Sequence, residues 1–324
     1  MAAFFTLIGA HERTIRSVHF APVYAPLTIA AASFDGTVSI WELPGGATRD
    51  DDWECVAQLE GHNSGTEVKC VRWNAHGSLL ATSGRDKTIW LWESYLPGTI
   101  GGPGSGVNET GGDFECLAVL NGHEGDVKCI EFANSHGEWG DGPEIILSAS
   151  YDDTIKCWAE EGGDWYCAAT LSGVHANTVW SITLSPSSGR LVSGSADGSI
   201  AIFKCYTSKQ KTELFPGDDP GGNGLWKCVG KLSDAHDGCV YSVAYAPSQV
   251  GHGRIATVGD DSKIQIIREV HGGRADSPKF LSEVSAFSTH GDIYSVAWHP
   301  SDDSILATAA DDGTIEVWKF QTRS

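Results

Sequence analysis

Residues 83–92 read Ser-Gly-Arg-Asp-Lys-Thr-Ile-Trp-Leu-Trp, a polar tight turn followed at once by an alternating apolar strand. His62 precedes the aspartate of this stretch, Asp86, by 24 residues, and Trp92 follows that aspartate by six. The same order of a His, an Asp and a Trp or other apolar residue recurs six times along the chain. The six sets are His11–Asp35–Trp41, His62–Asp86–Trp92, His123–Asp152–Trp158, His175–Asp197–Phe203, His236–Asp261–Ile267 and His290–Asp312–Trp318. A unit of this length cannot bury its own apolar face, so the repeat predicts stacked units around a shared core.

Each unit is predicted to contain four short strands joined by tight turns. In the second unit these strands cover residues 55–59, 68–73, 79–83 and 88–92, where apolar residues alternate as in antiparallel sheet. The prediction is a single all-β domain over 1–324. Its repeats are placed at about 9–41, 53–92, 114–158, 165–203, 226–267 and 281–318. The insertions are rich in Gly and Pro or are short extensions, and they read as exposed loops at 93–113, 137–143 and 204–225.

Composition excludes several classes of function. The net charge of −20 argues against direct nucleic-acid binding, because phosphate contacts require an excess of Lys and Arg. No apolar run reaches membrane-spanning length, and Met1 to Ile8 lacks the basic start and cleavage signal of a secretory leader. The nine cysteines form no CxxC pair. Cysteines in apolar strand patterns, such as Cys55, Cys70, Cys116, Cys129, Cys167 and Cys228, are predicted to be buried reduced thiols of a cytosolic or nuclear protein.

The repeat resembles the WD40-repeat family of β-propellers, whose signature is a Gly-His pair and a Trp-Asp pair that frame about forty residues. In this sequence Gly61-His62 and Gly122-His123 match the Gly-His pair. The resemblance implies an all-β propeller with four-stranded blades. It also implies a buried hydrogen-bonded relay in each unit, which joins a His, a Ser or Thr, an Asp and a Trp. Three units contain all four residue types: His62, Thr82, Asp86 and Trp92; His123, Ser148, Asp152 and Trp158; and His290, Thr308, Asp312 and Trp318. We expect incomplete relays in the other three units, because Ala31, Phe203 and Ile267 replace a relay residue.

Six units are recognisable, whereas WD40 propellers usually close with seven. Phe4 to Ile8 reads as an outer strand without a blade of its own, and it is expected to pair with the last unit and cover an open edge. The chain is therefore either a six-bladed ring or a seven-bladed homologue that lacks one N-terminal blade.

A second sequence pattern indicates which group of WD40 proteins the chain resembles. An aromatic residue, any residue and then Cys introduce four outer strands: Asp52-Trp53-Glu54-Cys55, Asp113-Phe114-Glu115-Cys116, Asp164-Trp165-Tyr166-Cys167 and Leu225-Trp226-Lys227-Cys228. Together with the sequences of residues 83–92, 120–123 and 148–156, this pattern resembles the WD-repeat proteins of cytosolic iron–sulfur protein assembly. The resemblance implies a scaffold of the cytosolic targeting complex that helps transfer preformed clusters to apoproteins. Its implied partners are a small assembly subunit, a large helical-repeat scaffold and the recipient apoproteins, in the cytoplasm and also the nucleus.

Propellers bind mainly through two kinds of position: the start of the strand after each His, and the residue before each structural Asp. These positions predict a partner-binding set of Arg16, Lys69, Arg85, Lys128, Tyr151, Trp180, Tyr241 and Tyr294. Aromatic and Arg side chains usually supply most of the energy of an interface. Arg85 is the strongest candidate, because it precedes Asp86 in the unit most like the family. The alternative is that Arg85 is a solvated turn charge.

The sequence contains no catalytic or cofactor motif. GxSxG, P-loop, HExxH and Rossmann patterns are absent, and the dispersed cysteines do not resemble cluster ligands. The prediction is a non-enzymatic protein without a metal or cofactor. Two other classes remain open: a WD40 adaptor of another complex, such as a ubiquitin-ligase substrate receptor or a chromatin-associated subunit, and an enzyme with titratable groups converging on one site.

Overall fold

The structure is a computed structural model that describes residues 9–22, 27–43, 53–63, 65–94, 114–186, 189–215, 224–247, 253–274 and 277–320. These residues contain 23 β-strands and one short helix. The strands form five four-stranded sheets and one three-stranded sheet, and within each sheet neighbours in sequence are neighbours in space. The prediction of an all-β repeat protein with short, turn-connected strands is confirmed.

The chain divides into two compact units. Unit 1 contains Met1–Leu147 and Trp158–Cys167, and unit 2 contains Ser148–Cys157 and Ala168–Ser324. The division runs through the third sheet, whose strands contribute residues to both units.

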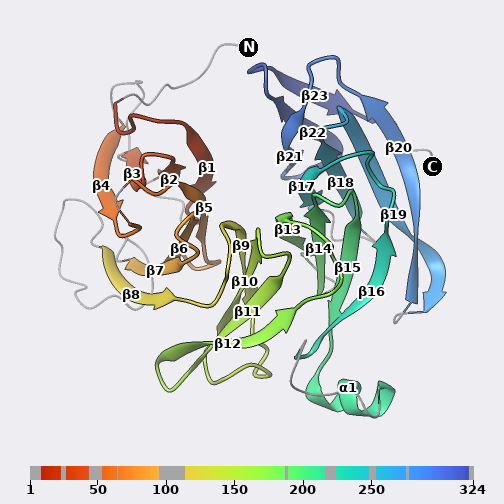
Figure 1. Cartoon of the computed structure of the whole chain (residues 1–324), viewed down its shortest axis with the longest axis horizontal. Coiled ribbons are helices and arrows are strands. Elements are labelled where there is room, and N and C mark those ends of the chain that lie inside the picture. The colour runs from red at the N-terminus through yellow and green to blue at the C-terminus, as the bar shows by residue number, and fades with distance from the viewer. Residues whose placement is uncertain are drawn as a thin grey trace. The chain divides into compact units, whose positions relative to one another are not determined.

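The first three sheets are coloured from red to green in Figure 1. The first contains β1 (Ile15–Phe20), β2 (Leu27–Ser33), β3 (Thr37–Leu43) and β4 (Glu54–Glu60). The second contains β5 (Val68–Trp73), β6 (Leu79–Gly84), β7 (Ile89–Ser94) and β8 (Phe114–Leu120). The third contains β9 (Val127–Asn134), β10 (Glu144–Ser150), β11 (Ile155–Glu161) and β12 (Asp164–Leu171).

The last three sheets follow the same plan. The fourth contains β13 (Val179–Leu184), β14 (Arg190–Ser195), β15 (Ile200–Cys205) and β16 (Trp226–Leu232). The fifth contains β17 (Val240–Tyr245), β18 (Arg254–Gly259), β19 (Lys263–Arg274) and β20 (Ser277–Phe287). The sixth contains β21 (Ile293–His299), β22 (Asp302–Ala310) and β23 (Ile315–Lys319).

The sequence repeat and the sheet are offset by one strand. Strand β4 opens the repeat at 53–92, yet it pairs with β3 of the first sheet, with Cys55 opposite Trp41. Each repeat therefore contributes an outer strand to one sheet and three strands to the next, which interlocks neighbouring sheets. The predicted edge strand Phe4 to Ile8, which would be the fourth strand of the last sheet, lies outside the described residues.

Within each unit, apolar side chains pack between neighbouring sheets. In unit 1, one cluster joins residues such as Ile40 and Val71 from the first and second sheets, and another joins Leu91 and Ile130 from the second and third. Two more clusters occur in unit 2, around Val240 and around Ile266. Strands β6, β10 and β14 are buried along nearly their whole length, which means that both of their faces are covered, because successive side chains point to opposite faces.

A β-bulge marks the start of the first strand in five sheets. The pairing register shifts between Ile15 and Ser17, and it shifts in the same way at the start of β5, β13, β17 and β21. A bulge leaves one residue unpaired and redirects its side chain. The unpaired residues are Arg16, Lys69, Trp180, Tyr241 and Tyr294, all of which belong to the predicted binding set.

Two of the predicted exposed loops are more structured than expected. Within 204–225, residues Ser208–Leu214 form helix α1, which Thr207 begins with a capping box that includes Gln210. Within 137–143, the Trp139 side chain is buried and the backbone N–H of Asp141 donates to the Glu160 carbonyl oxygen at 3.0 Å. Residues 95–113 of the remaining insertion lie outside the described residues.

The prediction of buried thiols holds for only part of the cysteine set. Cys70 and Cys129 are buried, whereas Cys55, Cys116, Cys167 and Cys228 on the outer strands are exposed. The reason is a second bulge, which follows Cys55, Cys116 and Cys228 in β4, β8 and β16. The inserted residue breaks the alternation that would have carried each of these thiols to the buried face.

Candidate partner-binding surfaces

The second unit contains a continuous relay of hydrogen bonds. His62 Nδ1 lies 2.9 Å from Asp86 Oδ2, and His62 Nε2 lies 3.0 Å from Thr82 Oγ1. The Trp92 indole N–H donates to the same Thr82 oxygen at 3.1 Å. Because Asp86 accepts from Nδ1, the hydroxyl of Thr82 must donate to Nε2, which fixes the tautomer of His62. Every polar group of the relay is thereby paired inside the sheet.

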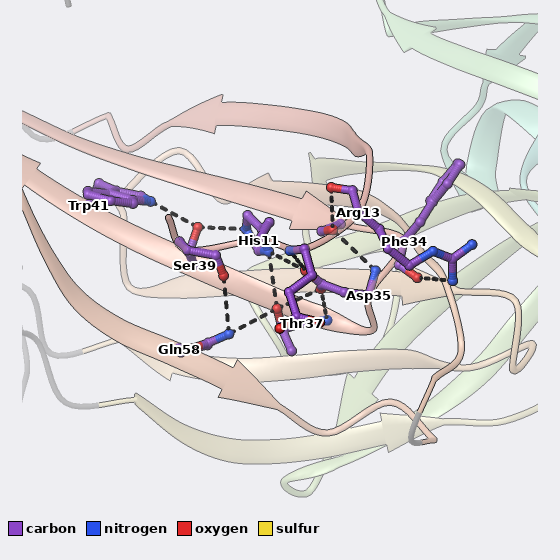
Figure 2. A network of polar contacts seen from close by, with 11 residues as sticks. His11, Arg13, Phe34, Asp35, Thr37, Ser39, Trp41 and Gln58 are labelled. Carbon is purple, nitrogen blue, oxygen red and sulfur yellow. Dashed lines mark hydrogen bonds and ion pairs between the residues drawn. The ribbon is translucent and has the colours of Figure 1, made fainter. Parts of the chain in front are cut away.

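The first unit has a relay too, so the expectation that Ala31 interrupts it is wrong. Ser39 on β3 supplies the missing hydroxyl: it lies 2.8 Å from His11 Nε2 and accepts the Trp41 indole N–H at 2.9 Å. His11 Nδ1 is 3.0 Å from Asp35 Oδ2. Figure 2 shows this chain of contacts from Trp41 through Ser39 and His11 to Asp35. Ala31 and Ser39 are direct partners across β2 and β3, so the hydroxyl has moved by one strand.

The third, fourth and fifth units contain related sets of contacts that differ in detail. His175 contacts Ser193 and Ser199 at 2.6 and 2.9 Å, and His236 contacts Asp261 and Thr257 at 2.8 and 2.9 Å. These relays lack the indole donor, as expected, because Phe203 and Ile267 replace the Trp. In the third unit, the His123 ring packs edge-on against Trp158 at 6.1 Å, and Asp152 accepts the backbone N–H of Thr154. The residue Ser148 is buried in β10.

The relay of the sixth unit is divided into two parts. His290 Nδ1 lies 2.9 Å from Asp312 Oδ2, and the Trp318 indole donates to Thr308 Oγ1 at 3.0 Å. Within the residues that the structure describes, no hydrogen bond joins His290 to Thr308. Glu316 lies 3.9 Å from His290 Nε2 instead.

The relay carboxylates are held in their charged form. Burial alone would raise the pKa of Asp86, but hydrogen bonds from His62 and Thr88 outweigh it and lower that pKa to about 2. The pKa of Asp35 is likewise lowered to about 2 by hydrogen bonds to Thr37 and Glu12, despite burial. Burial lowers the pKa of His175 to about 4, against the attraction of Asp197. These groups connect neighbouring strands, because their polar atoms are hydrogen-bonded to one another.

Arg85 occupies the turn that this relay fixes. Its backbone N–H donates to the Glu67 carbonyl oxygen at 2.9 Å, and Asp86 accepts the backbone N–H of Thr88 at 3.2 Å. A Cβ on the preceding Gly84 would lie 2.9 Å from the Glu67 oxygen, so this close approach requires glycine. The Arg85 side chain is 63% exposed. The turn therefore presents a guanidinium outward from a rigid base.

Other cations gather around Glu67. The carboxylate lies 3.5 Å from Arg13 and 3.7 Å from Arg85, and it accepts a hydrogen bond from Lys69. The hydrogen bond from Lys69 is the main reason why the pKa of Glu67 is lowered. Lys69 also lies over the Phe34 ring at 4.3 Å. Arg13 and Glu67 were not among the predicted site residues.

Lys128 and Arg16 belong to the same electrostatic neighbourhood. Burial lowers the pKa of Lys128, its partner Asp126 raises it, and the charges of Lys69 and Arg16 lower it again. The Lys128 ammonium lies 3.1 Å from Asp126. We call this set the Glu67 cluster, and it consists of Arg13, Arg16, Lys69, Arg85, Lys128, Glu67 and Asp126. It is a locally cationic surface in an acidic protein.

The aromatic members of the predicted set meet in unit 2. The Trp180 ring packs edge-on against Tyr241 with centroids 5.2 Å apart, and Tyr241 stacks on Tyr294 at 4.6 Å. Tyr294 is 38% exposed. Tyr151, also in unit 2, is 61% exposed on the turn before Asp152.

A cavity of about 210 Å³ in unit 1 contains none of the predicted residues. Its wall includes His19, Arg72 and Glu131, and Arg72 lies 3.7 Å from Glu131. Burial raises the pKa of Glu131 to about 7 against the attraction of Arg72. Arg72 is near the end of β5, whereas Lys69 is at its start, so this cavity and the Glu67 cluster lie at opposite ends of the strand.

Across the described residues, no group of three or more His, Cys, Asp or Glu side chains could hold a metal ion. The helix in this part of the chain, α1, is too short and polar to cross a membrane.

Comparison with known proteins identifies the repeat. The family model described as "WD domain, G-beta repeat" matches residues 4–42, 53–93, 114–159, 165–204 and 281–319. The chain belongs to the WD40-repeat family. The matched segments contain the first four and the last of the predicted repeats. The remaining repeat, 226–267, has Ile267 at the Trp position. The six sheets are WD40 blades, and the predicted propeller class is confirmed.

Individual relatives share a more specific name. The chain is 32% identical to "Probable cytosolic iron-sulfur protein assembly protein 1" of Botryotinia fuckeliana, over 97% of this chain and 85% of that protein. It is 34% identical to the protein of that name in Debaryomyces hansenii, over 96% of this chain and 86% of the relative. A probable cytosolic Fe-S cluster assembly factor of Schizosaccharomyces pombe is 33% identical over 97% of this chain and 46% of its own length. The predicted resemblance to this group of WD40 proteins is confirmed.

Proposed function

We propose that this protein is a non-catalytic scaffold of cytosolic iron–sulfur protein assembly that helps transfer preformed clusters to apoproteins. The observation that carries the proposal is the 32–34% identity to proteins named for this process, which extends over nearly the whole chain. A match of this extent includes the turns between strands as well as the core. The relatives' names place them in the cytosol, and we assign this protein to the same compartment.

The local geometry supports a role in binding. The relay of the second blade buries the side chains of His62, Thr82 and Asp86, which are hydrogen-bonded to one another and not accessible to a substrate. In contrast, the neighbouring Arg85 guanidinium is exposed. A rigid backbone that presents an Arg side chain limits the entropy lost on binding, as expected at an interface hot spot.

We assign the Glu67 cluster to a partner that carries carboxylates. Arg13 and Arg85 are its exposed cations, with side chains 52% and 63% accessible, whereas Lys69 and Lys128 are largely covered and support them electrostatically. The proposed partners are a small assembly subunit, a large helical-repeat scaffold and the recipient apoproteins.

Affinity purification from the source organism tests this function. The tagged protein is expressed at its natural level, and the recovered proteins are identified by mass spectrometry. We expect iron–sulfur assembly proteins and iron–sulfur apoproteins to be enriched over a tag-only control. Recovery of ubiquitin-ligase or chromatin subunits in their place would contradict the proposal.

Depletion of the protein in cells tests whether it is needed for cytosolic cluster assembly. Cluster content of a cytosolic iron–sulfur enzyme should fall, measured by radioactive iron incorporation, while a mitochondrial iron–sulfur enzyme keeps its clusters. Equal loss in both compartments, or loss in neither, would argue against a role in cytosolic assembly.

A further inference from the structure

The aromatic row of unit 2 is bordered by carboxylates. Asp260 and Asp311 occupy the position before the structural Asp in their blades, the position that Arg85 holds in the second blade. Asp292 lies directly before β21, two residues from Tyr294. The position before the structural Asp therefore carries a cation in the second blade and carboxylates in the fifth and sixth blades.

Backbone hydrogen bonds hold two of these residues beside the strands that carry the tyrosines. The Asp260 N–H donates to the Cys239 carbonyl oxygen at 3.2 Å, and the Asp311 N–H donates to the Asp292 carbonyl oxygen at 3.0 Å. The thiol of Cys239 interacts with both Asp260 and the Tyr241 hydroxyl, and the charges of Asp260 and Asp292 act on Tyr241. Burial is the main cause, and these charges a further one, of the raised pKa of the Tyr241 phenol. Burial raises the pKa of Asp292, and the charges of Asp311 and Asp260 raise it further.

Glycines leave room for two of the carboxylates. A Cβ on Gly238 would overlap Asp260 Oδ1, and a Cβ on Gly291 would lie 2.8 Å from Asp311 Oδ1. A larger residue at either glycine would displace the carboxylate. The turns before β17 and β21 are thus shaped so that each aspartate lies over the turn.

Among the described residues, the negative charge of this group has no ion-pair partner. In the described part of the chain, no Lys or Arg forms an ion pair with Asp260, Asp292 or Asp311, whereas Glu67 and Asp126 in unit 1 both have such partners. Aromatic faces next to carboxylates form a favourable site for an organic cation, because the ring quadrupole and the charges attract it together. A guanidinium fits best, since its planar group stacks on rings and also pairs with carboxylates.

We propose that Trp180, Tyr241, Tyr294, Asp260, Asp292 and Asp311 bind an arginine side chain presented by a protein partner. This proposal rests on the proposed scaffold function and specifies the chemistry of one of its surfaces. The guanidinium stacks on the exposed Tyr294 ring, and its N–H groups donate to the carboxylates. The WD40 chain would then recognise partners through opposite chemistries: carboxylates at the Glu67 cluster and an arginine at the aromatic row.

Peptide titration of the full chain tests the proposal. The probe is an acetylated and amidated Gly-Arg-Gly peptide, and the matched control contains citrulline, which has nearly the same shape but no charge. Fluorine NMR of protein labelled with fluorotyrosine reports binding, and Tyr241→Phe and Tyr294→Phe assign the two signals. We expect the arginine peptide to shift both signals saturably and to bind at least about fivefold more tightly than the citrulline peptide.

Two variants that each remove one negative charge make the test more specific. Asp292→Asn should weaken binding of the arginine peptide several-fold, whereas Asp234→Asn, which removes an exposed carboxylate elsewhere in unit 2, should leave it unchanged. Equal affinity for arginine and citrulline, equal effects of the two variants, or no shift of either tyrosine would overturn the proposal.

The outcome is separable from that of the scaffold function. A failed peptide titration with normal recovery of iron–sulfur assembly proteins would overturn only the arginine site. A successful titration without that recovery would overturn only the scaffold function.

Discussion

Arg85 and Glu67 are joined twice: the Arg85 backbone N–H donates to the Glu67 carbonyl oxygen at 2.9 Å, and the Arg85 guanidinium lies 3.7 Å from the Glu67 carboxylate. The first contact fixes the turn, and the second is a loose ion pair at the surface. Glu67 thus positions Arg85 through its backbone and partly neutralises it through its side chain.

Glu67→Gln should therefore strengthen binding of a carboxylate-bearing partner. The variant keeps the backbone contact but removes a charge that competes for Arg13, Lys69 and Arg85. We expect about a threefold gain in affinity, in line with ~0.5–1 kcal/mol for an exposed ion pair. Isothermal titration calorimetry with the purified carboxylate-bearing partner, at two salt concentrations, measures the affinity.

Glu213→Gln in α1 is the matched control, because Glu213 is exposed and pairs only loosely with Lys209 at 4.0 Å. Its affinity should equal that of the wild type. Weaker binding by Glu67→Gln would show that the carboxylate itself contacts the partner, contrary to the proposed role of the Glu67 cluster.

The relay of the first blade yields a stability prediction. Ser39→Ala removes the hydroxyl that accepts the Trp41 indole and contacts His11, so buried polar groups lose their partner. We expect a loss of about 1–3 kcal/mol in the free energy of unfolding. Adding Ala31→Ser should recover part of this loss, because Ala31 is the direct cross-strand partner of Ser39.

Urea unfolding of the single and double variants checks this prediction. No loss on Ser39→Ala would show that the relay contributes little. A double variant less stable than Ser39→Ala would show that the hydroxyl cannot act from β2.

Asp86 makes stability sensitive to acid. Its folded-state pKa is lowered from 3.8 to about 2, so its stabilising contribution is present above pH 3.8 and disappears as pH falls through about 2. A shift of this size corresponds to about 2 kcal/mol. Asp86→Asn should therefore be less stable than the wild type near neutral pH, and the difference should shrink toward pH 2. Denaturant midpoints at a series of pH values test this, and a difference that does not change with pH would contradict it.

Much of this architecture was predictable from the sequence because the repeat fixes it. The spacing of His62, Asp86 and Trp92 identifies the turns, and each turn locates neighbours such as Arg85. The position in the repeat also identifies the predicted binding residues at the start of the first strand of each sheet. Their common feature, a bulge at residues such as Lys69 and Tyr241, emerged only from the pairing register.

The misses have local causes. The relay hydroxyl was expected on β2, whereas Ser39 supplies it from β3, and the signal for this in the sequence is a Ser two residues before Trp41. The exposure of Cys55 depends on a bulge that strand alternation does not reveal. Arg13 and Glu67 join the Glu67 cluster through side-chain packing between neighbouring blades, which no repeat pattern encodes.

The exposed thiols should react slowly with alkylating agents. Partial burial of the sulfur raises the pKa of Cys55, Cys116 and Cys228 even though these residues are exposed overall, so little reactive thiolate is present at neutral pH. Iodoacetamide labelling followed by mass spectrometry should show rates below that of an unstructured cysteine peptide. These rates should rise about tenfold per pH unit while the thiols remain protonated. Rapid labelling near neutral pH would indicate activated thiols and contradict this account.

The most direct test of the account is partner capture by Arg85→Glu. Lys209→Glu is the matched control, since it reverses an exposed charge on α1. Both variants are expressed in cells depleted of the wild-type protein, and captured iron–sulfur assembly proteins are quantified together with the melting temperature of each variant. We predict that Arg85→Glu loses about tenfold or more of the captured partner, as a hot-spot Arg would, with an unchanged melting temperature. Capture equal to that of Lys209→Glu would contradict the assignment of this surface.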